Sequence, residues 1–245
     1  QLGRNFIPPD TMGAVGTKQF VEILNGAFAV YDKTTGANLK FVADNTFWTS
    51  IGGQATGGDP RIMFNAQYNR WVATGFGTDA KNIQIAVSDT DDALGGWKAT
   101  LFEGYNPTGL FRPIADYPTL AMDTNAMYIG TNNFASSTTG GVQTFRGTTL
   151  NVLPLADIMN LAGPSVSNRK TFENYFNTPG QASSFAGFAI QGVNSNESST
   201  TGNIVTVSAT DYAIQRYDVL NAGTAGATRT AVTDLATGSY TGNCG

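Results

Sequence analysis

Short apolar segments separated by tight turns recur along the chain at a nearly constant interval. In one copy Asp59 precedes an apolar segment, and a turn then leads to a segment headed by Trp71. In the next copy Asp116 stands before the apolar segment and Tyr128 heads the segment after the turn. The aromatic lies 12 residues after the aspartate in both copies, and the two aspartates are 57 residues apart. A repeat of this length built from strands is typical of the blades of a β-propeller.

Two further copies of the unit are visible. Asp10 leads to Phe20 with a spacing two residues shorter, and Glu173, again 57 residues after Asp116, leads to Phe185. The sequence therefore predicts an all-β fold, a β-propeller or partial propeller of about four antiparallel blades within a single domain. We expect the blades at approximately 10–50, 58–104, 115–165 and 170–220, with 221–245 as a weak tail or partial blade.

Local signals fill in some of the elements. Asn25 and Gly26 separate two apolar segments and predict a two-residue hairpin turn, in which both residues adopt a positive φ. Residues 83–88 alternate large apolar with small or polar side chains, as expected for a strand packed between blades. Residues 154–161 have helical spacing and predict one short helix.

Composition narrows the function classes. The 245-residue chain contains 29 glycines, only 13% charged residues and a net charge of −4, without a basic cluster, so nucleic-acid binding is not expected. No apolar run reaches the roughly 18–20 residues that span a bilayer, so membrane insertion is not expected either. The low charge and the many Thr, Asn and Gly residues favour an extracellular or cell-surface β protein. The chain lacks a leader-like start, and we expect that a leader was removed or that the chain is an excised piece.

The chain contains no histidine and one cysteine, Cys244. This excludes an internal disulfide, Ser-His-Asp and Cys-His catalysis, and every histidine-ligated metal site. We therefore expect no transition metal and no cofactor other than Ca²⁺, and assign no catalytic residue. Carboxylates, tyrosines and arginines remain, which are the residues that glycoside hydrolases use.

Four acidic residues form the candidate site: Asp10, Asp59, Asp116 and Glu173. Each precedes the first strand of its blade, and the first strands line the central channel of a propeller, so the carboxylates should gather at one mouth of that channel. They could cap turns between blades, bind Ca²⁺ or sugar hydroxyls, or act in catalysis. The recurrence in every blade favours the turn-capping interpretation, because a catalytic pair would not need four copies.

A second acidic group, Asp89, Asp91 and Asp92, stands before Gly95 and Gly96. It resembles a Ca²⁺ loop but lacks the terminal glutamate of an EF-hand. It is also loosely similar to the structural Ser-x-Asp-x-Gly-x-x-Trp hairpin of sialidases.

Three tryptophans could stack on sugars. Trp71 and Trp97 occupy repeat positions in strands, which favours packing between blades. Trp48 lies near a blade junction, and we expect it at the surface as the candidate ligand-contacting aromatic.

Several segments resemble a family of secreted or cell-surface bacterial β-propeller proteins with a sialidase-like propeller architecture. The resemblance covers residues 8–160 well and the rest loosely. The matching segments are Pro9–Gly16, Phe28–Gly36, Asp59-Pro60, Arg70-Trp71-Val72, Ile85–Thr90, Gly95-Gly96-Trp97, Asp116-Tyr117-Pro118 and Thr131–Phe134. It implies a ring of six or seven blades, from which this chain departs by ending early.

We interpret the chain as an extracellular, non-enzymatic module for binding, adhesion or assembly, with a carbohydrate or a protein as ligand. One alternative is a carboxylate-based glycoside hydrolase or lyase, and a second is a structural subunit of a filament or surface array. Four blades leave exposed faces and strand edges, so we expect self-association, a protein partner or further chain to cover them.

Overall fold

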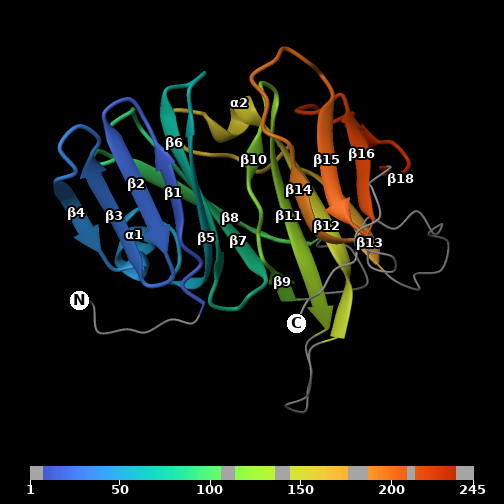
Figure 1. The fold of residues 1–245 in the computed structure, drawn as a ribbon, viewed down its shortest axis with the longest axis horizontal. Helices are drawn as coiled ribbons and strands as arrows, with labels where there is room; N and C mark the ends of the chain where they lie inside the picture. The colour runs from blue at the N-terminus through green and yellow to red at the C-terminus, as the bar shows by residue number, and fades with distance from the viewer. Residues whose placement is uncertain (1–7, 106–113, 136–143, 176–186, 209–212, 236–245) are drawn as a thin grey trace.

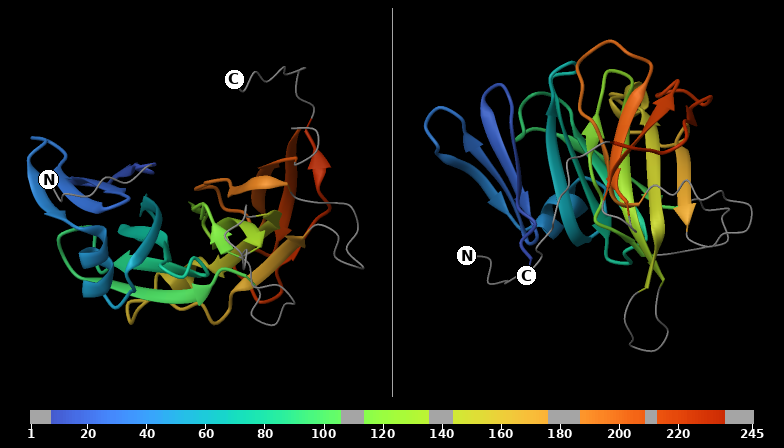
Figure 2. Two further views of the ribbon diagram at one scale, coloured as in Figure 1. Left: turned by 90° about the horizontal axis from the view of Figure 1, so that it is seen from below. Right: turned by 45° about the vertical axis from the view of Figure 1, so that its right-hand side comes forward.

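The computed structural model describes residues 8–105, 114–135, 144–175, 187–208 and 213–235 (Figure 1). Four antiparallel sheets follow one another along the chain and stand side by side in an open arc (Figure 2). The predicted all-β, propeller-like fold of four antiparallel sheets is confirmed.

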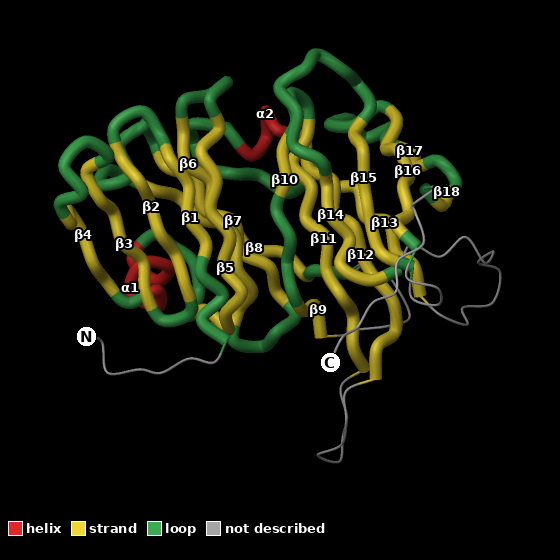
Figure 3. Tube along the Cα trace, in the orientation of Figure 1, coloured by secondary structure: helices red, strands yellow, loops and turns green. Residues whose placement is uncertain are grey.

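The first two sheets are simple four-stranded meanders. The first sheet consists of β1 (Met12–Val15), β2 (Gln19–Leu24), β3 (Ala27–Asp32) and β4 (Asn38–Val42). A short helix, α1 (Asp44–Ser50), connects it to the second sheet (Figure 3). The second sheet consists of β5 (Thr56–Asn65), β6 (Arg70–Gly77), β7 (Asn82–Ser88) and β8 (Trp97–Glu103).

The third and fourth sheets have five strands each. The third contains β9 (Ile114–Asp116), β10 (Ala121–Met122), β11 (Ala126–Ala135), β12 (Thr144–Pro154) and β13 (Lys170–Tyr175). The predicted helix is present as α2 (Leu155–Ile158). The fourth contains β14 (Phe188–Gly192), β15 (Gly202–Val207), β16 (Ile214–Leu220), β17 (Thr228–Arg229) and β18 (Thr233–Asp234). The strand at residue 170, expected to open the fourth blade, is therefore the outer strand of the third sheet.

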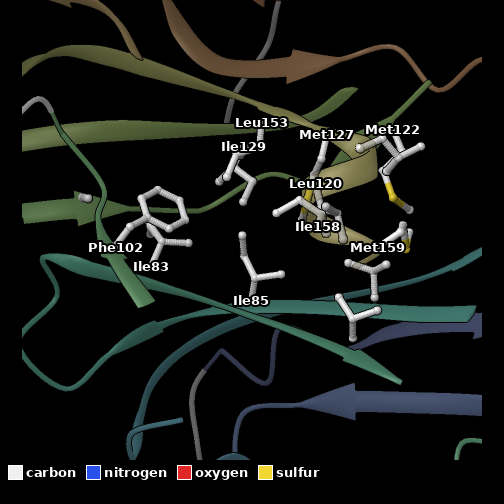
Figure 4. Close-up of a cluster of buried hydrophobic side chains, with 14 residues drawn as sticks. Ile83, Ile85, Phe102, Leu120, Met122, Met127, Ile129, Leu153, Ile158 and Met159 are labelled. Atoms are coloured by element: carbon white, nitrogen blue, oxygen red, sulfur yellow. The ribbon is translucent and has the colours of Figure 1, made fainter. Parts of the chain in front are cut away.

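Three hydrophobic clusters hold the arc together, and each lies between two neighbouring sheets. The first interface, between the first and second sheets, is rich in aromatic residues and includes α1. The second interface, between the second and third sheets, is mostly aliphatic and methionine-rich (Figure 4). The third joins the third and fourth sheets. Within the described residues, no such cluster joins the first sheet to the fourth, and Figure 2 shows the arc open between them.

The predicted hairpin at Asn25 and Gly26 joins β2 to β3. Only Gly26 adopts a positive φ, of 98°, so the expectation that both turn residues would do so is wrong. Asn25 keeps an ordinary backbone conformation, and its side chain is used at the candidate site. Among the described residues, no helix has the length and apolar character needed to cross a membrane.

Candidate functional site

Asp10 lies two residues before β1, Asp59 lies within β5 and Asp116 ends β9, so only Asp10 precedes the first strand of its sheet as expected. These strands lie on the concave side of the arc (Figure 2). The side chain of Asp59 is hydrogen-bonded to that of Asp10, and the charges of both Asp10 and Asp116 act on it. We call these three carboxyl groups the acidic rim. Their proximity is the geometry that the repeat spacing predicts for three of the four acidic positions.

Burial and neighbouring carboxylates raise the pKa of Asp59. Desolvation is the largest cause, followed by the hydrogen bond that the protonated Asp59 shares with Asp10 and by the negative charges of Asp10 and Asp116. Arg61 acts in the opposite direction, and the resulting pKa of Asp59 is about 7. A neutral Asp59 carboxyl can donate a hydrogen bond, which ionised carboxylates cannot. Near neutral pH this proton is shared with Asp10, and the other carboxyl oxygens of the rim can accept hydrogen bonds.

Asn25 couples the first and second sheets at the rim. Its Nδ2 donates to Asp10 Oδ2 at 2.6 Å and to the Pro8 carbonyl at 3.0 Å, while its Oδ1 accepts from the Asp59 backbone N–H at 2.9 Å. The third and fourth sheets repeat half of this arrangement, since Asn132 Oδ1 accepts from the Ala189 N–H at 2.9 Å. An asparagine side chain therefore fixes the first strand of the next sheet at both places.

The backbone is left-handed at one residue in or beside the first strand of each sheet. The four residues and their φ values are Asp10 at 44°, Asp59 at 49°, Tyr117 at 52° and Ala189 at 54°. Non-glycine residues adopt this conformation rarely, and aspartate tolerates it better than most. Asp10 and Asp59 therefore also suit the left-handed backbone at their positions. In the third sheet the left-handed position falls on Tyr117, one residue after Asp116.

Arg61 and Tyr117 complete the surroundings of the rim. The buried guanidinium of Arg61 lies over the Tyr117 ring, 4.9 Å from its centroid, and its Nη1 donates to the Pro60 carbonyl at 3.0 Å. Tyr117 is 42% exposed, so its ring offers apolar surface beside the carboxyl groups. Sequence reasoning did not identify Asn25, Arg61 or Tyr117. The only signal in the sequence is that Tyr117 directly follows Asp116 and that Arg61 lies two residues after Asp59.

Glu173 does not join the rim, and its placement before a first strand is wrong. It lies in β13, the outer strand of the third sheet, where it pairs with Thr149 and accepts a hydrogen bond from the Tyr175 hydroxyl at 3.0 Å. The corresponding position at the start of the fourth sheet is Ala189. Phe185, the aromatic expected to follow Glu173, lies outside the described residues, as does Cys244.

Trp48 is buried, and the expectation of a surface aromatic is wrong. Its side chain in α1 is 0% exposed and contacts the Phe47 ring at a centroid distance of 5.3 Å. The apolar side of this short helix packs into the first interface, which removes Trp48 from any ligand. Trp71 and Trp97 are also buried there, as expected for packing residues.

Asp89, Asp91 and Asp92 have separate partners and do not converge as a Ca²⁺ loop. Asp89 forms an ion pair with Lys98, which lies across the hairpin. Asp91 accepts from the Thr17 hydroxyl at 2.7 Å, and Asp92 accepts from the Gln19 side-chain amide at 2.7 Å. These contacts attach the hairpin of the second sheet to the first sheet. In the described part of the chain, no three His, Cys, Asp or Glu side chains are grouped to hold a metal ion.

The fold defines the chain as an all-β, propeller-like protein. No protein-family model and no curated protein matches its sequence. Among solved structures, two variants of the Synechocystis apocarotenoid oxygenase are similar to it, with TM-scores of 0.51 and 0.50 and 12% identity. The alignments cover 90% and 89% of this chain and 47% of the oxygenase chain in each case, so this chain spans about half the oxygenase length.

A third similar structure is the GH43_1 enzyme from Xanthomonas citri complexed with xylose. Its TM-score is 0.38 at 13% identity, and the alignment covers 91% of this chain and 73% of the enzyme. At such identities these similarities concern the fold alone.

Proposed function

We propose that this protein is a non-enzymatic binding module whose acidic rim recognises a carbohydrate. The observation that carries the proposal is the convergence of three carboxyl groups from consecutive sheets beside a half-exposed tyrosine ring. Carbohydrates present hydroxyl groups, which donate and accept hydrogen bonds, and apolar C–H faces. The rim matches both properties.

The hydrogen-bonding match comes from carboxyl oxygens. The proton of Asp59, whose pKa is about 7, is shared with Asp10, and the carboxyl oxygens outside this hydrogen bond can accept from sugar hydroxyls. The apolar match comes from Tyr117, because the guanidinium of Arg61 covers one face of its ring and orients it. The other face can stack on a sugar ring, as aromatic side chains do at binding sites.

The closeness of Asp10 and Asp59 favours binding over hydrolysis. Glycoside hydrolysis uses two carboxyl groups roughly 5–9.5 Å apart, so that a sugar bond or a water fits between them. Two carboxyl groups that share a hydrogen bond are closer than this. The glycoside hydrolase alternative would have to use Asp59 with Asp116, and the observation that favours it is the pKa of Asp59, which suits a general acid near neutral pH.

The test is a binding survey with defined polysaccharides. Soluble xylan, arabinan, β-glucan and galactan are screened by affinity electrophoresis, and the positive ones are titrated by calorimetry. Tyr117→Ala should weaken binding at least about tenfold through lost stacking, and Asp59→Asn should weaken it less because the amide still donates. Leu161→Ala, a change at an exposed residue away from the rim, is the control.

Each outcome of the survey has a defined meaning. No binding by the unmodified protein, or equal binding by the Tyr117→Ala and Leu161→Ala proteins, overturns the proposal. Release of reducing sugar, abolished by Asp59→Asn, supports the hydrolase alternative instead. Titrations with EDTA and with added CaCl₂ determine whether Ca²⁺ participates, as the sequence leaves possible through oxygen ligands.

We also propose an extracellular or cell-surface location for this activity. The support is the low content of charged residues and the sequence resemblance to secreted bacterial propeller proteins. Fractionation of the native source, followed by detection of the chain with an antibody, tests the location. Recovery in the cytosolic fraction alone would contradict it.

A further inference from the structure

We propose that the protein binds a second copy of itself head to tail, with the outward face of the first sheet packed on the outward face of the fourth. The argument rests on three observations: the composition of the two faces, their shapes, and the way in which sheets already pack inside the arc. It is independent of the carbohydrate proposal.

The outward face of the first sheet, called the head face, is apolar, and none of the described sheets covers it. In β2 the alternate residues Val21 and Ile23 face the second sheet, so the residues between them point outward. Cross-strand pairing places Val15 and Tyr31 beside Phe20, and Phe41 beside Ala29. The head face consists of Val15, Phe20, Glu22, Leu24, Tyr31 and Phe41. Val15 is 57% exposed and Phe41 48% exposed, which is a large exposure for such side chains on one sheet.

The outward face of the fourth sheet, called the tail face, has the same character. In β15 Ile204 faces the third sheet, so Val205 and Val207 point outward. Cross-strand pairing adds Ile214 beside Val207, and Arg216 beside Val205. Phe188 also pairs with Val207, but its ring contacts Phe145 of the third sheet at a centroid distance of 5.4 Å, so it is not part of this face. The tail face consists of Val205, Val207, Ile214, Arg216 and Asp218. Val207 and Ile214 are both exposed.

The two faces complement each other in shape. The head face contains a shallow cavity of about 300 Å³ lined by Phe20, Glu22 and Tyr31 and by the turn that follows β3. The tail face presents exposed branched side chains, Val207 and Ile214, that can fill such a cavity. The charges are paired within each face: Glu22 accepts a hydrogen bond from the Tyr31 hydroxyl at 3.3 Å, and Arg216 forms an ion pair with Asp218 at 3.0 Å.

The packing inside the arc specifies the orientation of the contact. Each sheet packs the face that points toward the C-terminal end of the arc on the opposite face of the next sheet. The three hydrophobic clusters fill these three contacts. Packing a tail face on a head face repeats this arrangement. Packing two head faces together would not, since it would place the same face of two sheets in contact. The contact is therefore heterologous, and each copy has one of each face.

The test uses one charged substitution on each face. Phe41→Glu places a charge on the head face and Val207→Glu places one on the tail face, and each alone should raise the dissociation constant for self-association at least about tenfold. Leu161→Glu, at a residue that is 73% exposed and belongs to neither face, is the matched control. Sedimentation velocity across the micromolar range measures the mass, with 25.8 kDa expected for one copy.

Mixing the two variants distinguishes a head-to-tail contact from other contacts. Phe41→Glu protein retains its tail face and Val207→Glu protein retains its head face, so the mixture should form a one-to-one pair that cannot grow further. Circular dichroism melting confirms that both variants are folded, and Val15→Glu replaces Phe41→Glu if the latter is not. Two results overturn the proposal: an unmodified protein that stays at the mass of one copy, or association that Val207→Glu leaves unchanged.

Discussion

The first and second interfaces join neighbouring sheets of the same kind with different chemistry. The first is filled by aromatic rings: Phe28 stacks on Phe47 at 4.0 Å, and Trp97 meets Phe47 edge-on at 5.2 Å. The second is aliphatic where Ile85, Met127 and Ile129 meet (Figure 4). At the end where Asn151 and Arg169 lie, the second interface is polar.

The polar end of the second interface is held by hydrogen bonds that cross between sheets. Asn151 Nδ2 donates to the Gly104 carbonyl at 3.0 Å, and Arg169 Nη1 donates to the Glu103 carbonyl at 2.7 Å. The guanidinium of Arg169 also lies over the Phe102 ring, 4.6 Å from its centroid. Two sheets can thus be joined by filling volume or by satisfying buried polar groups. The first interface should be sensitive to lost volume, and the second to a lost hydrogen-bonding partner.

The largest effect is expected from removing volume at the first interface. Trp71 is fully buried and its Nε1 donates to the Asp91 carbonyl at 2.9 Å, so Trp71→Ala leaves a cavity and an unpaired acceptor. We expect a loss of about 3–5 kcal/mol in the free energy of unfolding. Urea denaturation measures it, with Leu161→Ala as a surface control that changes stability by less than about 0.5 kcal/mol. A loss below about 1 kcal/mol would show that the aromatic cluster tolerates cavities.

An intermediate effect is expected from a polar residue at the second interface. Asn151 is 0% exposed, donates to Gly104 and accepts from the Thr171 hydroxyl at 3.0 Å. Asn151→Ala removes the hydrogen-bonding partner of both the Gly104 carbonyl and the Thr171 hydroxyl. We expect a loss of about 2–3 kcal/mol in the free energy of unfolding. Asn196→Ala, at an exposed residue, is the matched control for the same denaturation experiment. If both variants unfold alike, cross-sheet hydrogen bonds do not hold the polar end.

The smallest effect, a pH dependence, is expected at the rim, where the two sheets of the first interface meet the concave side. Asp59 is only half-buried, so solvent screens much of what its pKa shift would contribute to stability. The pKa of Asp59 is raised from 3.8 in the unfolded chain to about 7 in the folded protein. Between these values the folded state holds a proton that the unfolded state has released, so this group makes the protein less stable as pH rises from about 4 to about 7.

Asp59→Asn should remove that slope, because asparagine resembles the neutral carboxyl and tolerates the positive φ. The measurement is the difference in melting temperature between variant and unmodified protein at several pH values. The variant should gain stability relative to the unmodified protein as pH rises. Glu197→Gln, at an exposed residue, should show no such trend. A difference that is constant with pH would mean that Asp59 titrates normally.

The sequence was sufficient for the all-β, propeller-like fold and for the proximity of Asp10, Asp59 and Asp116. The spacing of Asp59 and Asp116 reflects equivalent strands, because the second sheet and the connection after it have the length of one repeat. The same spacing failed for Glu173 because the third sheet is longer: β12 has 11 residues and β13 follows a helix and a loop. Equal intervals in sequence indicate equal positions only while the units have equal length.

The other residues of the site could not be inferred from local sequence. Asn25 reads as a turn residue, and nothing near it shows that its amide will reach Asp59 in the next sheet. Arg61 and Tyr117 lie in different sheets, and only the packing of those sheets places the guanidinium on the ring. The expectation that Trp48 lies at the surface was wrong for a related reason. The short helix α1 is rich in polar, β-branched and aromatic residues, which are weak helix formers, so its buried side was not apparent.

The placement of one hydrophobic cluster in each gap between sheets makes the molecule a short linear array. The second and third sheets are supported on both sides, whereas the first and fourth are each supported on one. In such an array stability is a sum over neighbours, and partial opening begins at the ends. Backbone amides should therefore exchange with solvent fastest in the two end sheets, and any contact that covers an end sheet also slows the first step of unfolding.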